Sequence, residues 1–84
     1  MPTAHIRRKR AIAEKIGDVE DKRYIISRCA LSDIDKRILT MTLIEHKDRG
    51  CIADMLRYDP SQITRHLQKS LIVFEAVALK FNKL

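Results

Sequence analysis

The segment Tyr58-Asp59-Pro60 constrains the fold of this chain more than any other, because it marks where a long helix begins. Asp59 is suited to cap exposed backbone amides, and Pro60 fits the first helical position, where no N–H is needed. Gln62 completes the spacing of a capping box. After Pro60 neither Gly nor Pro occurs again, and apolar side chains recur at helical spacing: Ile63, Leu67, Leu71, Phe74, Ala78 and Phe81. The sequence therefore predicts a helix of about twenty residues with a continuous apolar seam.

Three capping residues earlier in the chain predict further helices. Asp18, Ser32 and Asp48 each precede a stretch with helical apolar spacing, and each side chain can accept hydrogen bonds from a first helical turn. We expect helices from about 19 to 29, from 33 to about 45 and from 49 to 57. A further helix over 3–16, which Gly17 ends or bends, is expected before them.

Length and composition favour one small all-α domain. A chain of 84 residues leaves no room for a second hydrophobic core, and two Gly and two Pro are too few for a turn-rich β architecture. No pair of strands with a tight turn is present, so we expect no wing. The prediction is a compact domain of four or five helices over residues 1–84, with a basic N-terminal segment (1–30), a core (31–70) and an apolar helical extension (71–84).

The charge balance favours a polyanionic partner. Lys and Arg number 17 against 11 Asp and Glu, which gives a formal net charge of +6 and points to nucleic acid first and an anionic membrane surface second. No apolar run approaches the ~18 residues of a membrane span, and no signal peptide follows the basic start. We therefore expect a cytoplasmic, nucleoid-associated protein with no membrane partner.

The last two predicted helices suggest a helix-turn-helix over about 48–69. Ala53 is the small residue where the first helix would cross the second, and the aliphatic residues around it would fix the crossing angle. The second helix then keeps a polar edge for solvent or for DNA. A plain solvated helix face stays open as the alternative, because most helices carry polar residues on one side.

Residues along this polar edge differ in what they can recognise. Gln62 and Arg65 are the candidates for reading bases, since Gln pairs bidentately with adenine and Arg with guanine. Other side chains suit phosphate oxygens, which position a protein without specifying sequence. This second set comprises Ser61, Thr64, His66 and Lys69, with Arg49 from the preceding helix.

Two runs of sequence carry a resemblance to a known family. They are LSDIDKRIL at 31–39 and CIADMLRYDPSQITR at 51–65. The stretch from Leu31 to Leu71 resembles region four of bacterial sigma factors and the related helix-turn-helix domains of small phage and plasmid regulators. In that family L-x-x-x-D/E-R-x-I-L is followed, after a turn, by E-I-A-x-x-L-G-Y-S-P-S-T-V-S-R. The resemblance implies that the residues from Ser61 to Lys69 form the DNA-reading surface.

The chain departs from the family pattern around the turn. Arg57 stands where the family has Gly, so either Arg57 adopts a left-handed conformation or the turn differs. Gly50 lies inside the short preceding helix, and Cys51 replaces the usual acidic residue. Cys51 and Cys29 lack the spacing of a metal site or redox pair, and we expect both to be reduced and buried.

The two ends of the chain carry separate hypotheses. The basic cluster Arg7, Arg8, Lys9 and Arg10 is either an arm that contacts DNA or a solvated face. The C-terminal extension is apolar on most sides, which favours a homodimer that shares this helix, with burial inside one monomer as the alternative. The residues expected at the dimer interface are Leu71, Phe74, Val77, Ala78 and Phe81.

Taken together, these features predict a sequence-specific double-stranded DNA-binding transcription regulator, a repressor or accessory factor of a bacterial, phage or plasmid system. The histidines and cysteines show no metal spacing and no catalytic arrangement, so we expect no enzyme activity, no metal and no cofactor. One alternative is a protein-interaction module that contacts RNA polymerase or another regulator. Another is a nonspecific nucleoid or plasmid-partition protein.

Overall fold

The computed structural model describes residues 17–81, and these residues form an all-helical body. Its helices are α2 (Val19–Arg28), α3 (Asp33–Leu43), α4 (Arg49–Leu56) and α5 (Pro60–Lys80). The prediction of an all-α fold is confirmed for this part of the chain. The helix expected over 3–16 and the basic cluster Arg7 to Arg10 lie outside the described residues.

The predicted capping residues begin the helices as expected. The Asp18 carboxylate accepts a hydrogen bond from the Glu20 amide, at 2.9 Å. The Asp48 carboxylate accepts one from the Cys51 amide, at 2.7 Å. Ser32 likewise caps α3, and at α5 the Gln62 side chain reaches back to the Asp59 amide. The helix starts could therefore be predicted because each depends on a local side chain.

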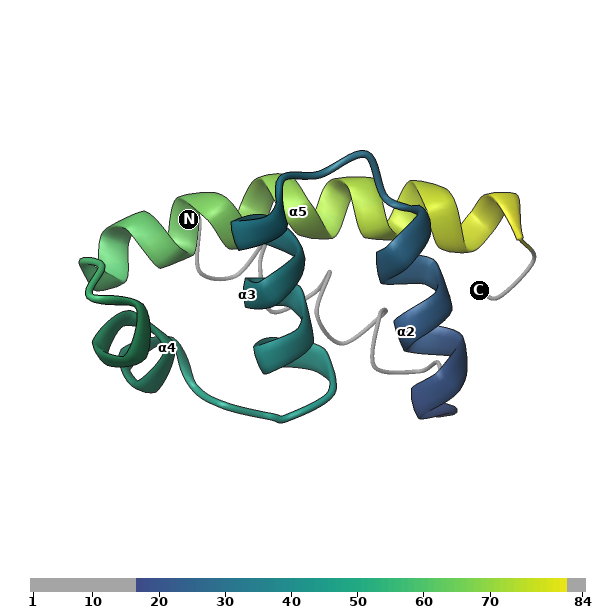
Figure 1. Cartoon of the computed structure of the whole chain (residues 1–84). Coiled ribbons are helices and arrows are strands. Elements are labelled where there is room, and N and C mark those ends of the chain that lie inside the picture. Colours follow the sequence, from purple (N-terminus) through teal and green to yellow (C-terminus); the bar gives the residue numbers. More distant parts are fainter. Residues whose placement is uncertain (1–16, 82–84) are drawn as a thin grey trace.

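The long helix α5 organises the fold, since the other three helices all pack along one side of it (Figure 1). It has 21 residues, which at 1.5 Å per residue is about 31 Å. The described part of the chain has a longest extent of 34 Å, so α5 runs nearly the whole length of the molecule. The start of α5 lies over α4, its middle over α3 and its C-terminal half over α2 (Figure 1).

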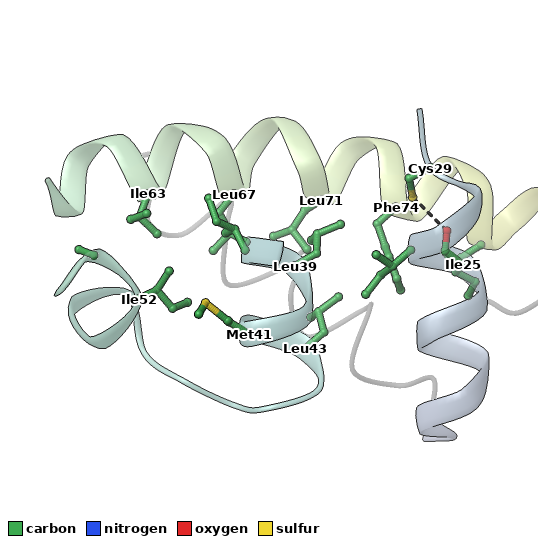
Figure 2. Close-up of a cluster of buried hydrophobic side chains, with 14 residues drawn as sticks. Ile25, Cys29, Leu39, Met41, Leu43, Ile52, Ile63, Leu67, Leu71 and Phe74 are labelled. Atoms are coloured by element: carbon green, nitrogen blue, oxygen red, sulfur yellow. Dashed lines mark hydrogen bonds between the residues drawn. The ribbon is translucent and has the colours of Figure 1, made fainter. Parts of the chain in front are cut away.

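The core lies beneath the seam of α5. Figure 2 shows Ile63, Leu67, Leu71 and Phe74 pointing from α5 toward side chains of the three shorter helices. All four are at most 1 % exposed. They face a buried set that includes Ile25, Ile38, Leu39, Leu43 and Ile52, each 0 % exposed. The predicted seam is thus confirmed, with Phe81 half-buried at its end.

One buried charge joins the first two described helices. Lys22, 5 % exposed, donates a hydrogen bond from Nζ to the carbonyl oxygen of Leu43, at 3.0 Å. That carbonyl is in the last turn of α3. Carbonyls in the last turn have no partner within their own helix and lie at the negative end of the helix dipole. The contact thus satisfies a carbonyl at the end of α3, and the helix ends at Leu43, two residues before the end expected from the sequence.

The turn between α4 and α5 keeps the geometry that a glycine normally provides. Arg57 has φ 58° and ψ 40°, in the left-handed region. The Tyr58 amide donates to the Ala53 carbonyl at 2.9 Å, and the Arg57 amide donates to the Asp54 carbonyl at 3.4 Å. This is the Schellman arrangement that ends many helices. Of the two possibilities left open by the sequence, the left-handed Arg57 is therefore the one realised.

Candidate nucleic-acid interface

The start of α5 is fixed by its packing on α4. Only residues 57–59 separate the two helices, and α4 crosses beneath the first turns of α5 (Figure 1). Ile52 and Ala53, 0 % and 2 % exposed, face the buried seam residues Ile63 and Leu67. The small side chain of Ala53 at this buried position allows the two backbones to approach closely.

The opposite edge of α5 is open to solvent. Ser61, Gln62, Arg65 and Lys69 are exposed, while Thr64 and His66 are half-buried. The sequence pattern thus separates the inward apolar residues from the outward polar ones correctly. The structure brings all six candidates from this helix onto its first three turns.

Gln62 is held by the cap of its own helix. Its Oε1 accepts a hydrogen bond from the Asp59 amide at 2.9 Å. Bidentate pairing with adenine uses both the carbonyl and the amino group of a Gln side chain. Reading a base in this way would therefore require Gln62 to release the cap, at a cost of about 1 kcal/mol. Ser61 is also turned toward the cap, because its Oγ donates to Asp59 Oδ2 at 3.3 Å.

Arg49 and Thr64 join the two helices. Arg49 Nη1 donates to Thr64 Oγ1 at 3.1 Å, and the same hydroxyl donates to the Pro60 carbonyl at 3.1 Å. The sequence placed both residues in the DNA-binding set but gave no sign of their contact, which spans 15 positions. Their first role in the structure is to fix the position of α5 on α4.

Arg65 differs from these neighbours. It is exposed and, among the residues the structure describes, has no hydrogen-bond or ion-pair partner. Its guanidinium therefore keeps all its donors for an external ligand. Of the two candidate base readers, Arg65 is therefore the one whose hydrogen-bond donors are not engaged by other described residues.

A buried carboxylate lies under the basic edge of α5. Asp35 of α3 is 1 % exposed and receives His66 Nδ1 at 2.6 Å and Lys69 Nζ at 3.0 Å. Burial raises the pKa of Asp35, but hydrogen bonds from His66, Lys69 and Ser32 and the charge of Lys69 lower it by more, so the net shift is downward. Asp35 therefore stays ionised at neutral pH. From the sequence, Asp35 is expected only to interact with the positive end of the α3 dipole. Its contacts with α5 could not be foreseen, because its partners lie more than 30 positions away.

The same residues border a shallow, open hollow of about 210 Å³, lined by Arg65, His66 and Lys69. All three are basic side chains. One of these residues, His66, also contacts the Tyr58 ring, with the two ring centroids 5.7 Å apart. An anion entering the hollow would thus meet basic groups, with the Asp35 carboxylate screened behind them.

The expected dimer residues fall mostly inside the monomer. Leu71, Phe74 and Ala78 are at most 1 % exposed and pack in the core of the single chain. Val77 is half-buried, as is Phe81, whose ring contacts that of Tyr24 edge-on at 5.4 Å. Burial within one monomer, the alternative left open by the sequence, therefore describes the first three residues. The large apolar side chains that α5 exposes are instead Ile72 and Leu79, at 51 % and 56 %.

The cysteines are free thiols in different surroundings. Cys29 is buried, and its Sγ donates to the Ile25 carbonyl at 3.2 Å (Figure 2). Burial raises the pKa of Cys29, and the charge of Lys36 opposes this only in part. Cys51 is exposed, so the expectation that it is buried is wrong. The buried residues of α4 are Ile52 and Ala53, and Cys51 lies on the outer side of this helix.

Within residues 17–81 no group of three or more His, Cys, Asp or Glu side chains is placed to hold a metal ion. None of the helices described is long and apolar enough to cross a membrane. No protein-family model, curated protein or solved structure matches this chain.

Proposed function

We propose that this protein is a DNA-binding transcription regulator that places the first turns of α5 in the major groove of double-stranded DNA. The observation that supports the proposal is that the first turns of α5 have one buried apolar side and one exposed basic side. Ile63 and Leu67 anchor these turns on α4, while Arg65 and Lys69 are exposed on the outer edge. A helix held in this way can project a basic edge into a groove.

The charge of the chain supports the same partner. A net charge of +6 on 84 residues favours association with a polyanion. Arg65 has the chemistry to read guanine through its O6 and N7 atoms. Lys69 and Ser61 suit phosphate oxygens, which would set the position of α5 on the duplex.

Substitution of Arg65 tests the proposal after a bound sequence has been selected from a random duplex pool. The Arg65→Ala variant should lose about 5- to 150-fold in affinity for the selected site, which corresponds to 1–3 kcal/mol for a bidentate base contact. Arg23→Ala removes the same charge from an exposed position on α2 and serves as the matched control. Its affinity should change little.

Two results would contradict the proposal. If the pool yields no enriched sequence, the protein binds DNA nonspecifically or not at all. If Arg65→Ala and Arg23→Ala weaken binding equally, only general charge is involved and α5 does not read bases.

A protein partner is the second candidate function. Under it, the exposed side chain of Met55 on α4, 51 % exposed, would contribute an apolar contact to another protein such as RNA polymerase. Under this alternative Met55→Ser abolishes partner binding, whereas Arg65→Ala leaves it intact. Measuring both variants against the same polymerase preparation separates the two functions.

A further inference from the structure

The hollow on α5 has one wall whose charge can change near neutral pH. Arg65 and Lys69 carry fixed positive charges there, whereas the third lining residue is His66. Imidazole is the side chain that ordinarily gains or loses a proton in this pH range. The charge that an entering anion meets therefore depends on the state of His66.

The hydrogen bond to Asp35 occupies one ring nitrogen of His66 and leaves Nε2 as the one available to an anion. Asp35 is ionised and can only accept, so His66 Nδ1 must carry a hydrogen and donate it, over 2.6 Å. In the neutral ring, Nε2 then carries a lone pair and no hydrogen. A phosphate oxygen near this lone pair would be repelled. Protonation at Nε2 turns the same atom into a charged donor.

We propose that the hollow binds one backbone phosphate of DNA and that His66 takes up a proton from solvent as the phosphate enters. The inference rests on the proposed DNA-binding function and names how this part of the surface is regulated. The proton adds to His66 Nε2 and no other bond changes. DNA affinity should therefore fall as pH rises, because the bound state holds one more proton than the separate partners.

The groups around His66 support proton uptake at this atom. Asp35 of α3 contacts Nδ1 and is itself hydrogen-bonded to the capping residue Ser32, and its carboxylate stabilises a positive ring directly. Lys69 and Arg65 on α5 oppose a third positive charge in the empty hollow. Tyr58 adds a ring contact from the turn. A bound phosphate offsets the repulsion from the two cations, so the protonated ring is more favourable with the phosphate in place than in the empty hollow.

The size of the effect follows from linkage. If DNA raises the midpoint of His66 protonation by one pH unit, the DNA affinity at low pH is about tenfold higher than at high pH. The affinity is constant at pH values well below the midpoint of the free protein and well above that of the complex. Calorimetry in two buffers with different heats of ionisation measures the protons taken up on binding. Ionic strength must be held constant, because phosphate contacts are sensitive to salt.

His66→Asn is the informative variant, because its amide can still donate to Asp35 but cannot take up a proton. His46→Asn removes a histidine from the loop between α3 and α4 and is the control. Wild type and His46→Asn should bind duplex DNA more weakly as pH rises and take up a proton on binding, while His66→Asn should show neither. Circular dichroism and thermal unfolding establish that each variant is folded.

Three outcomes separate the two proposals. Equal pH dependence in wild type and His66→Asn overturns the role of His66 and leaves DNA binding intact. Failure of the wild type to bind any duplex at any pH overturns the proposed function, and this inference with it. If His66→Asn does not fold, NMR titration of the His66 ring in the wild type decides. A titration midpoint that rises when duplex DNA is added supports the inference, and an unchanged midpoint refutes it.

Discussion

Asp35 shows how one residue can link stability to the functional surface. It is buried on α3, yet its partners His66 and Lys69 lie on the exposed edge of α5. The carboxylate fixes the tautomer of His66 and the direction of Lys69. An apolar residue at this position would leave both side chains without this contact.

Asp35→Asn should destabilise the fold in a pH-dependent way. The pKa of Asp35 is lowered in the folded state, so its stabilising effect is present above the ordinary Asp pKa of about 3.9 and is lost as pH falls through the folded value. At pH 7 we expect a loss of about 1–3 kcal/mol in the free energy of unfolding by urea. The difference from wild type should shrink as pH falls below the ordinary Asp pKa.

Asp33→Asn is the control for this prediction, since Asp33 is an exposed acid in the same first turn of α3. It should cost well under 1 kcal/mol, as expected for a surface charge near a helix terminus. A loss from Asp35→Asn that does not change with pH would show that the carboxylate charge is not what stabilises the contact.

Arg57→Gly should stabilise the protein. Arg57 holds a left-handed conformation that costs a non-glycine residue about 1–2 kcal/mol, and Gly adopts it without that penalty. Because Gly loses more entropy on folding, the net gain in unfolding free energy should be about 0.5–1 kcal/mol. Arg37→Gly, at an exposed position inside α3, should instead lose about 1 kcal/mol. Equal effects in thermal unfolding would contradict this account of the turn.

At the scale of helices, local signals were sufficient to predict where each element begins and which face is buried. Asp18, Ser32, Asp48 and Pro60 mark the starts, and the spacing from Ile63 to Ala78 marks the seam of α5. These predictions succeed because a cap or a helix face depends on residues within a few positions.

The same reasoning fails where the cause is distant in sequence. The hydrogen bond at the end of α3 comes from Lys22, which is 21 positions before its partner Leu43. The surroundings of His66 depend on Asp35, and those of Thr64 on Arg49. The sequence thus predicted which residues of α5 face outward, but not that several of them are already engaged with other residues.

At the scale of the whole molecule, α5 separates two surfaces. Its first turns carry the basic edge, and its later turns expose Ile72 and Leu79. Ala76 is also exposed and lies between them at helical spacing. We propose that this second surface, rather than the buried residues expected from the sequence, forms a two-fold dimer.

The dimer proposal predicts that the wild type sediments as a dimer at micromolar concentration and that Leu79→Glu sediments as a monomer. A charge placed in an apolar interface is costly to bury. Ala30→Glu introduces the same side chain at an exposed position between α2 and α3 and should remain dimeric. A monomeric wild type, or identical behaviour of the two variants, would reject the dimer.

The most direct test of the account is an NMR titration of the ¹⁵N-labelled protein with the selected DNA duplex. The account predicts that the largest shifts occur at the backbone amides of residues 61–69, on the first turns of α5. Amides of α2, at the other end of the molecule, should move least (Figure 1). Shifts concentrated on α2, or none along α5 when DNA is bound, would contradict the claim that this edge is the DNA-contacting surface.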